Sequence, residues 1–167
     1  MTRRSSPKER WTERKIQISR VTKVCKGGKK LSFRAVIALG NENGVVGVGV
    51  GKADDVVNAI SKATTSAKRN VITVTIAKNK TITHVIHGVY GASKVLIKPA
   101  VQGTGVIAGS SIRTVLELAG LKNILAKQLG SNNLLNNARA TVVALNNLKE
   151  PKQVAMERNI PMEKLYS

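Results

Sequence analysis

The sequence is poor in cysteine and in aromatic residues, and each shortage excludes a class of protein. Its single cysteine, Cys25, rules out an internal disulfide and a cysteine-rich zinc site. Only four of the 167 residues are Phe, Trp or Tyr, so the core must be aliphatic and base-stacking platforms such as RRM sheets are disfavoured. No apolar run approaches the roughly 20 residues that span a bilayer. The length suits one ordinary domain or two small ones.

Acidic residues are also scarce, and the resulting charge points to the class of partner. The chain has 28 Lys and Arg against nine Asp and Glu, a net charge of +19. Nucleic acid is the usual partner of such a charge, with an anionic membrane surface as the rival. Residues 1–34 have a net charge of +10, residues 35–113 of +6 and residues 114–167 of +3. RNA or DNA contacts are therefore expected mainly near the N-terminus.

The first half of the chain has the pattern of a small α+β unit. Glycine-containing turns separate three apolar stretches, and a segment with helical spacing of its apolar residues follows. Asp54 and Asp55 at the start of that helix suit its dipole, as do Lys68 and Arg69 at its end. The pattern predicts strands at 15–25, 31–39, 45–51 and 71–76, and a helix at 53–69 with a stripe of Ala53, Val56, Val57, Ile60, Ala63 and Ala67.

A second α+β unit is predicted after a polar boundary at 77–80. Segment 122–130 fits either a strand or a helix, and the helices on both sides favour a strand. Gly120 is placed to end one helix, and Ser131 or Asn132 to cap the next. The expected elements are strands at 81–91, 93–100 and 122–130, and helices at 109–119, 134–148 and 151–158. The fold class is α+β with two small domains, 15–77 and 81–158. A basic arm (1–14) precedes them and a tail (159–167) follows. The arm is rich in Arg and Ser like a transit peptide, but it contains Glu9.

The stretch VQGTGVIAGSSIR at 101–113 matches a dinucleotide-binding pattern but lacks its context. Gly103, Gly105 and Ala108 fit G-x-G-x-x-G/A. A dinucleotide site also needs an acidic residue about 20 positions on for the ribose. Residues 118–149 contain no Asp or Glu, and Glu117 comes too early. We therefore interpret these glycines as a tight strand-to-helix turn rather than a cofactor site.

Other catalytic motifs fail in the same way. GVGVGKA at 47–53 approaches a P-loop, but its first glycine and its final hydroxyl residue are missing. Arg113 stands where a G-x-S-x-G hydrolase motif needs its second glycine. His84 and His87 are three apart in a predicted strand, so they point to opposite faces, without carboxylates or thiols nearby. We expect no enzyme activity, no cofactor, no metal and no small-molecule substrate.

Basic residues crowd the predicted hairpin between residues 15 and 39. A glycine-tipped basic hairpin can enter a groove and place cationic groups and backbone N–H groups on phosphates. The alternative is a solvated charged surface without a ligand. Phosphates, 2′-hydroxyls and RNA shape are the expected targets, because aromatic residues are scarce. The residues concerned are Arg20, Lys23, Lys26, Lys29, Lys30 and Arg34.

The alternation of Val and Gly over 45–51 leaves one face of a predicted strand bare. Such a face either makes room for packing within the domain or lets RNA or a protein approach the backbone. We expect packing at Gly47 and contact with a partner at Gly51. Three further basic residues join the predicted RNA-binding set: Lys52, Lys68 and Arg69.

Several blocks of sequence resemble one family. VTKVCKGGKKLSFRA, NENGVVGVGVGKA, IKPAVQGTGVIAG, RTVLELAG and KNILAKQLGS occur in this order. Together, over roughly residues 12–160, they closely resemble bacterial-type small-subunit ribosomal protein five, and they are most similar to its cyanobacterial and plastid branch. The resemblance implies a first domain like the double-stranded-RNA-binding fold. It implies a second α+β domain with a left-handed crossover.

The resemblance also implies a function and two sites. The family binds small-subunit rRNA beside ribosomal proteins four and eight, lines the mRNA entry side and supports decoding accuracy and mRNA unwinding. Its hairpin, near the spectinomycin site, corresponds to Arg20, Thr22, Lys23, Lys26, Gly27 and Gly28. Its contact with protein four corresponds to Gly103, Thr104, Gly105, Gly109 and Arg113. The expected location is the ribosome, in a plastid stroma in preference to a bacterial cytoplasm. A free nucleic-acid chaperone using the same hairpin is the alternative function.

Overall fold

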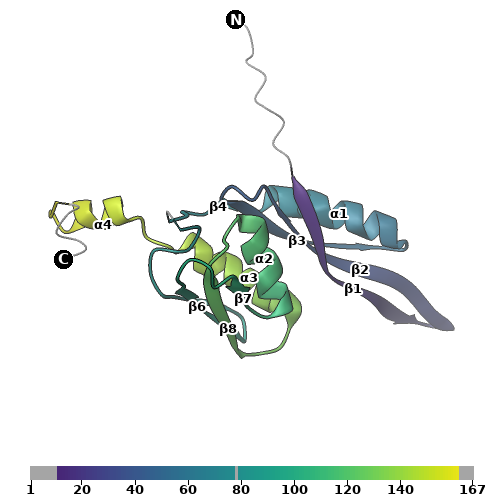
Figure 1. The fold of residues 1–167 in the computed structure, drawn as a ribbon. Helices are drawn as coiled ribbons and strands as arrows, with labels where there is room; N and C mark the ends of the chain where they lie inside the picture. The colour runs from purple at the N-terminus through teal and green to yellow at the C-terminus, as the bar shows by residue number, and fades with distance from the viewer. Residues whose placement is uncertain (1–10, 78, 162–167) are drawn as a thin grey trace, which may run out of the picture.

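The computed structural model describes residues 11–77 and 79–161, which build two four-stranded sheets and four helices (Figure 1). Strands of the first sheet and its helix come first in the chain, and the second sheet with three helices follows. The elements are β1 (Thr12–Cys25), β2 (Gly28–Gly40), β3 (Val45–Ala53), α1 (Val56–Arg69), β4 (Val71–Thr73), β5 (Ile86–Tyr90), β6 (Ser93–Pro99), β7 (Val106–Ile107), α2 (Ser110–Ala119), β8 (Ile124–Gly130), α3 (Leu134–Asn146) and α4 (Pro151–Glu157).

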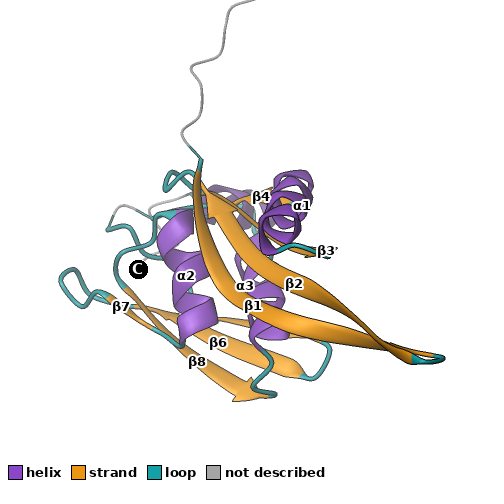
Figure 2. Cartoon of the chain, turned by 90° about the vertical axis from the view of Figure 1, so that its right-hand side faces the viewer, coloured by secondary structure: helices purple, strands orange, loops and turns teal. Residues whose placement is uncertain are grey.

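The first sheet is antiparallel and its two long strands project from the body as a hairpin. The strand order is β1-β2-β3-β4. β1 and β2 pair from Thr12 opposite Gly40 to Cys25 opposite Gly28, with a register shift between Lys15 and Gln17. β3 pairs with β2 only as far as Ala53 opposite Phe33. Beyond this point the hairpin is two-stranded and extends away from the rest of the molecule (Figures 1 and 2).

The glycine face of β3 packs directly against α1. A Cβ atom added at Gly47 would lie 2.6 Å from the carbonyl oxygen of Ala67, and one at Gly51 would overlap the backbone of α1 in the same way. Gly51 is buried, so the expectation that it contacts a partner is wrong. The small faces of both elements meet here, since the buried residues of α1 are Ala59, Ala63 and Ala67.

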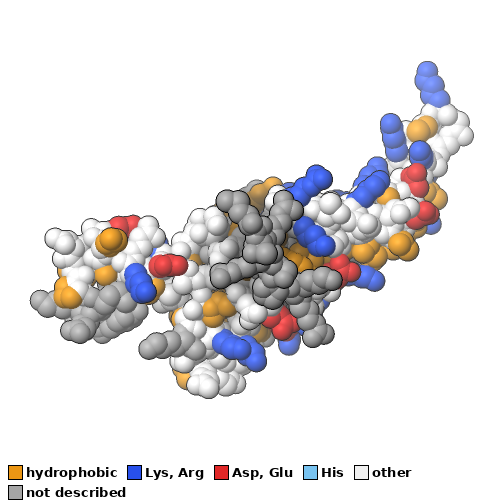
Figure 3. Space-filling view, turned by 90° about the horizontal axis from the view of Figure 1, so that it is seen from above, with side chains coloured by type: hydrophobic (Ala, Val, Ile, Leu, Met, Phe, Trp, Pro, Cys, Tyr) orange, Lys and Arg blue, Asp and Glu red, His pale blue; other side chains and the backbone are white. Residues whose placement is uncertain are grey.

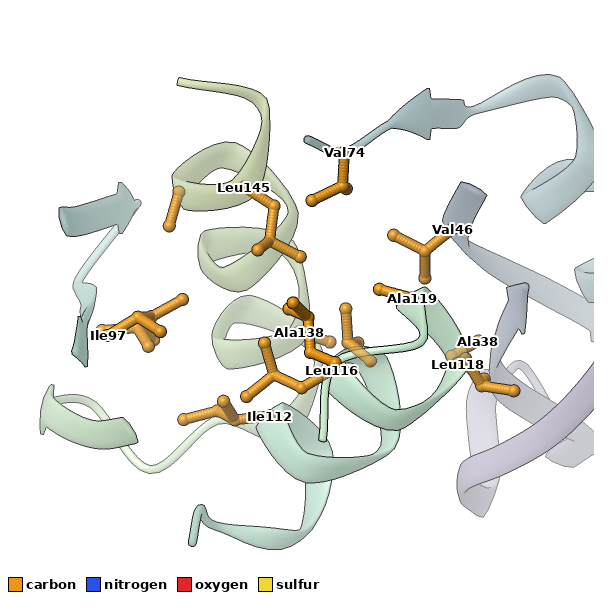
Figure 4. Packing of buried hydrophobic residues seen from close by; sticks show 14 of the residues in the cluster. Ala38, Val46, Val74, Ile97, Ile112, Leu116, Leu118, Ala119, Ala138 and Leu145 are labelled. Carbon is orange, nitrogen blue, oxygen red and sulfur yellow. The ribbon is translucent and has the colours of Figure 1, made fainter. Parts of the chain in front are cut away.

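The second sheet is mixed, and α2 and α3 lie between it and the first sheet (Figure 2). Its order is β5-β6-β8-β7, with β7 parallel to β8 and joined to it through α2. Buried residues of both sheets and both helices form one continuous apolar cluster (Figure 4). Ala38 and Val46 from the first sheet and Ile97 from the second meet Leu116 and Ala138 of the helices in this cluster. One core therefore holds the two sheets together.

The C-terminal end of α2 is capped by the turn between β2 and β3. Gly120 ends the helix in the left-handed conformation (φ +91°), as predicted. The N–H groups of Glu42 and Gly44 donate to the carbonyl oxygens of Leu118 and Ala119 at 3.0 and 2.9 Å. Carbonyls at a helix end have no partner within the helix. Here the first sheet supplies that partner and fixes its position relative to α2.

Several predicted boundaries are corrected by the structure. Residues 12–14 belong to β1 rather than to the basic arm, of which 1–10 lie outside the described residues. The strand predicted at 71–76 ends at Thr73, and that at 81–91 begins only at Ile86. The two-residue strand β7 was not predicted. Its shortness leaves no period-2 pattern to read.

The helix predictions need smaller corrections. Val57, placed in the apolar stripe of α1, is 77% exposed, and Ala59 takes the buried position instead. The cap of α3 is Asn133, whose side chain accepts from the N–H of Leu135, rather than Ser131 or Asn132. The predicted stripe of α2 is confirmed, since all of its members are fully buried: Ile112, Val115, Leu116 and Ala119. The tail beyond residue 161 lies outside the described residues.

Candidate nucleic-acid interface

The predicted RNA-binding residues of the hairpin divide between its two faces. Side chains directly opposite one another in an antiparallel pair share a face, and faces alternate along each strand. We call the face that continues the surface packed on α2 and α3 the core-side face. We call the face that continues the surface covered by α1 the helix-side face. The core-side face carries Lys23, Lys30, Arg34 and Lys52, and the helix-side face carries Arg20, Thr22 and Lys29.

The core-side face is basic. Lys23 stands directly opposite Lys30, and Arg34 directly opposite Lys52. Between these two rows, Ser32 donates from Oγ to Oδ1 of Asp54 at 3.3 Å. A shallow hollow of about 360 Å³ runs along this part of the sheet, and four lysines and one aspartate line it together with Ser32 and Ala53: Lys23, Lys30, Lys52, Lys62 and Asp54. Lys and Arg side chains gather along the projecting hairpin in Figure 3.

The helix-side face mixes basic with apolar residues. Arg20 stands opposite Phe33, Thr22 opposite Leu31, and Lys29 opposite Val24. Ile18, Val24 and Leu31 on this face are exposed, Val24 to 73%. The two faces of one hairpin therefore differ in chemistry, which a count of basic residues along the sequence does not reveal.

The tip of the hairpin is an open glycine turn. Gly27 has a φ of +83°, which side chains rarely adopt, and no atom lies within 4 Å of a Cβ added at Gly27 or at Gly28. Lys26 beside them is exposed. The turn therefore presents backbone and an ammonium group to solvent, in the arrangement expected from the sequence.

The structure does not bring Lys68 and Arg69 to the hairpin. They end α1, whose first residues lie beside the end of β3 from which the hairpin extends. A 14-residue helix is about 21 Å long, so these two cations lie at the opposite end of the unit. Arg69 instead lines a separate hollow of about 310 Å³ on α1 with Ser61, Lys62, Thr65 and Ser66.

The predicted protein-contact loop is held by a residue that sequence reasoning missed. Gly103 (φ +95°) and Gly105 (φ +76°) adopt the left-handed conformation. Their N–H groups donate to Oδ1 of Asn123 at 3.0 and 3.5 Å, and Nδ2 of Asn123 donates to the carbonyl of Asn79 at 2.8 Å. Thr104 stays exposed and donates from Oγ1 to the carbonyl of Val101. A polar residue between a helix-ending glycine and an apolar strand was the available signal for Asn123.

Gly109 and Arg113 lie at the start of α2, beside an ion-pair network. Gly109 occupies the N-cap position. Arg113 donates from Nε to Glu117 at 2.7 Å, and Arg14 of β1 also pairs with Glu117. The bond from Arg113 lowers the pKa of Glu117 below its ordinary value of 4.5. Partial burial opposes this effect, and the bond from Arg14 adds to it. The network therefore ties the root of the hairpin to α2 while the Arg113 side chain stays 58% exposed.

The glycine loop does not have the geometry of a dinucleotide site. β7 lies between Gly105 and α2, so the glycines do not adjoin the helix N-terminus where a pyrophosphate binds. Among residues 11–77 and 79–161 no three His, Cys, Asp or Glu side chains cluster as metal ligands. His84 precedes β5 and its Nδ1 lies 2.9 Å from Oγ1 of Thr83, so the strand predicted there is wrong. No helix in this part of the chain is long and apolar enough to cross a membrane.

Comparison with known proteins gives consistent matches over nearly the whole chain. The family model "Ribosomal protein S5, N-terminal domain" matches residues 11–75, and "Ribosomal protein S5, C-terminal domain" matches residues 88–158. Small ribosomal subunit protein uS5 of Crocosphaera subtropica is 59% identical over 99% of this chain and 95% of its own length. The uS5 protein of Picosynechococcus is 61% identical over 94% of this chain and 91% of its own length. Protein uS5c of Pyropia yezoensis is 57% identical over 94% and 90%.

Proposed function

The chain belongs to the ribosomal protein S5 family of the small ribosomal subunit, and we propose that it binds small-subunit rRNA through its basic hairpin. Members of this family are structural proteins rather than enzymes. One observation carries the proposal: the projecting hairpin combines a high density of exposed cations with an open glycine tip. Phosphate contacts of this kind position a protein on RNA without stacking on bases.

The proposed RNA-contact residues remain those predicted from the sequence, but their positions relative to the hairpin differ. Lys23, Lys26, Gly27, Gly28 and Lys30 lie at or near the projecting end of the hairpin. Arg34 and Lys52 form the row at its root, whereas Lys68 and Arg69 lie too far away to share that contact and would meet a different part of the RNA. Arg20, Thr22 and Lys29 complete the set on the helix-side face.

We propose a second contact, with ribosomal protein four, at the loop of Gly103, Thr104 and Gly105 and at Arg113. The loop is exposed, its shape is fixed by Asn123, and Arg113 offers an exposed guanidinium on α2, the next helix along the chain. Ribosomal protein eight and mRNA at the entry side are further proposed neighbours. A role in decoding accuracy and mRNA entry follows from this placement.

Sedimentation of fractionated cells tests the assembly. The protein should travel with the small subunit on a sucrose gradient and leave it only on a high-salt wash, because salt weakens phosphate contacts. A protein that stays at the top of the gradient would support a free nucleic-acid chaperone instead. The relatives are both cyanobacterial and plastid proteins, so the compartment needs its own test. If the source cells contain plastids, the same fractionation is carried out on isolated plastids. It distinguishes a plastid stroma, which we favour, from a bacterial cytoplasm.

A matched pair of triple variants tests the hairpin. Changing Lys23, Lys26 and Lys29 to Ala should weaken binding to small-subunit rRNA and flatten its salt dependence. The control changes three exposed lysines on β6 and β8 to Ala and removes the same charge: Lys94, Lys98 and Lys127. The control should retain most of the wild-type affinity. Equal losses in both variants would contradict a hairpin-directed contact.

A further inference from the structure

The core-side face of the hairpin holds cations in pairs that oppose folding. Opposed side chains in an antiparallel pair have Cβ atoms roughly 4.5–5.5 Å apart, and like charges at such positions are destabilising. The face has two such pairs, Lys23 with Lys30 and Arg34 with Lys52. A solvated charged surface has no need to place two like-charged pairs on one face of one sheet, one between β1 and β2 and the other between β2 and β3.

The protein supplies almost no counter-charge for these four cations. In the described part of the chain none of them takes part in an ion pair. Nε of Arg34 is buried without a hydrogen-bond partner, although buried polar groups are normally satisfied. The one carboxylate in the hollow, Asp54, accepts from Ser32, and Lys62 adds a further cation. The site is therefore short of acceptors and of negative charge.

We infer that the core-side face is a phosphate-binding site for RNA, with one backbone phosphate at each cationic pair. This inference rests on the proposed function and assigns it to one face of the hairpin. The rows of Lys30 and Arg34 are four residues apart, about 13 Å at the usual rise of a strand, so they receive phosphates of different nucleotides. Lys62 of α1 adds a further cation to the hollow, whereas Ser32 between the two rows is buried and already donates to Asp54. On the helix-side face, with exposed Ile18, Val24 and Leu31, Arg20 and Lys29 each stand opposite an uncharged residue, so each contributes a weaker, single contact to the RNA.

Two double variants with equal charge loss test the assignment. Lys30→Gln with Lys52→Gln removes one cation from each core-side pair. Arg20→Gln with Lys29→Gln removes two cations from the helix-side face of the same hairpin. Binding of each full-length protein to a small-subunit rRNA transcript is measured across a KCl series. The core-side variant should lower the slope of log affinity against log salt by about 2 units, and the helix-side variant by about 1 unit or less.

Thermal unfolding without RNA gives a second and independent readout. Relieving two like-charge pairs should raise the Tm of the core-side variant by about 1–5 °C. The helix-side variant should leave the Tm unchanged or lower it, since Arg20 and Lys29 oppose uncharged residues. A residue kept for structure alone would instead lower the Tm when replaced. Weaker RNA binding combined with a higher Tm would thus show that these cations destabilise the free protein and serve to bind RNA.

The outcomes separate this inference from the function on which it rests. If the wild-type chain does not bind the rRNA, the proposed function fails. If the wild type binds and both double variants lose equal slope, the hairpin acts as a diffuse positive charge and the face-specific site is refuted. A fall in the Tm of the core-side variant would also overturn it. A larger slope loss in the core-side variant than in the helix-side variant, with a raised Tm, supports it.

Discussion

Substitution of Gly49 by alanine should destabilise the protein far more than one methyl group would suggest. Gly49 lies in the middle of the glycine face of β3, directly beneath α1. Its added Cβ would lie 2.8 Å from Cα of Ala67 and closer still to the carbonyl oxygen of Ala63 and the N–H of Ala67. These are backbone atoms of a regular helix, so no side-chain rotation relieves the overlap.

The size of the effect follows from what must move. Ordinary Cβ contacts begin near 3.4 Å, so α1 has to retreat by at least 0.6 Å at Ala67. That retreat opens the contact made by the fully buried Ala59, Ala63 and Ala67. Overpacking a close-packed core costs roughly 1–3 kcal/mol, and the rigid backbone on both sides places this case at the upper end. A loss of about 3 kcal/mol lowers the Tm of a chain this size by about 6–12 °C.

A second glycine on a strand provides the matched control. Gly28 has nothing within 4 Å of an added Cβ and is outside the left-handed region of φ. Gly28→Ala should leave the Tm unchanged or raise it slightly, because the unfolded chain loses freedom. Both variants are compared with the wild type by circular dichroism during heating. Equal Tm values for Gly49→Ala and Gly28→Ala would refute the close approach of β3 and α1.

Three further perturbations address the network, the loop and the core. Glu117→Gln should be less stable than the wild type near neutral pH. Because the pKa of Glu117 is lowered in the folded state, this difference in stability should shrink and vanish as the pH falls below 4.5. Urea midpoints at a series of pH values measure the difference, and one that persists in acid would contradict the role of the carboxylate. Asn123→Ala should lower the free energy of unfolding by about 1–3 kcal/mol and speed hydrogen exchange at the amides of Gly103 and Gly105. Unchanged exchange would show that the loop keeps its conformation without Asn123. Leu116→Ala, at a fully buried position between the sheets, should lower the free energy of unfolding by about 2–5 kcal/mol, and the protein should still unfold in a single transition. Two separate transitions would mean that the two sheets do not share one core.

Most of the helices and strands could be predicted from local patterns. The alternation of Val and Gly indicated β3, helical spacing indicated α2 with its end at Gly120, and KGGKK indicated the hairpin turn. The failures occur where the pattern is short or where packing overrides it. β7 has two residues, and Val57 has the spacing of a core position but faces solvent because α1 is turned with its alanines toward the glycine face.

The candidate sites were predicted as sets of residues, and their grouping came from the structure. The sequence pattern around the glycine loop does not indicate Asn123, because its hydrogen bonds to the loop join segments about 20 residues apart. Lys62 lines the same hollow as the hairpin lysines, and nothing in the local sequence around it indicates this. The pattern around Gly51 wrongly predicts a partner surface, because a bare strand face has the same pattern whether it meets RNA or a helix.

Composition and spacing alone established a basic, aliphatic α+β chain with a charged hairpin, because charge, hydrophobic period and turn residues are properties of local sequence. They could not establish which cations stand opposite one another. The register between paired strands determines these pairs, and register depends on two segments of the chain together. They also could not show that Lys68 and Arg69 lie a helix length from the hairpin, or that one core joins both sheets. These are distances between segments remote in sequence, and only the packed chain defines them.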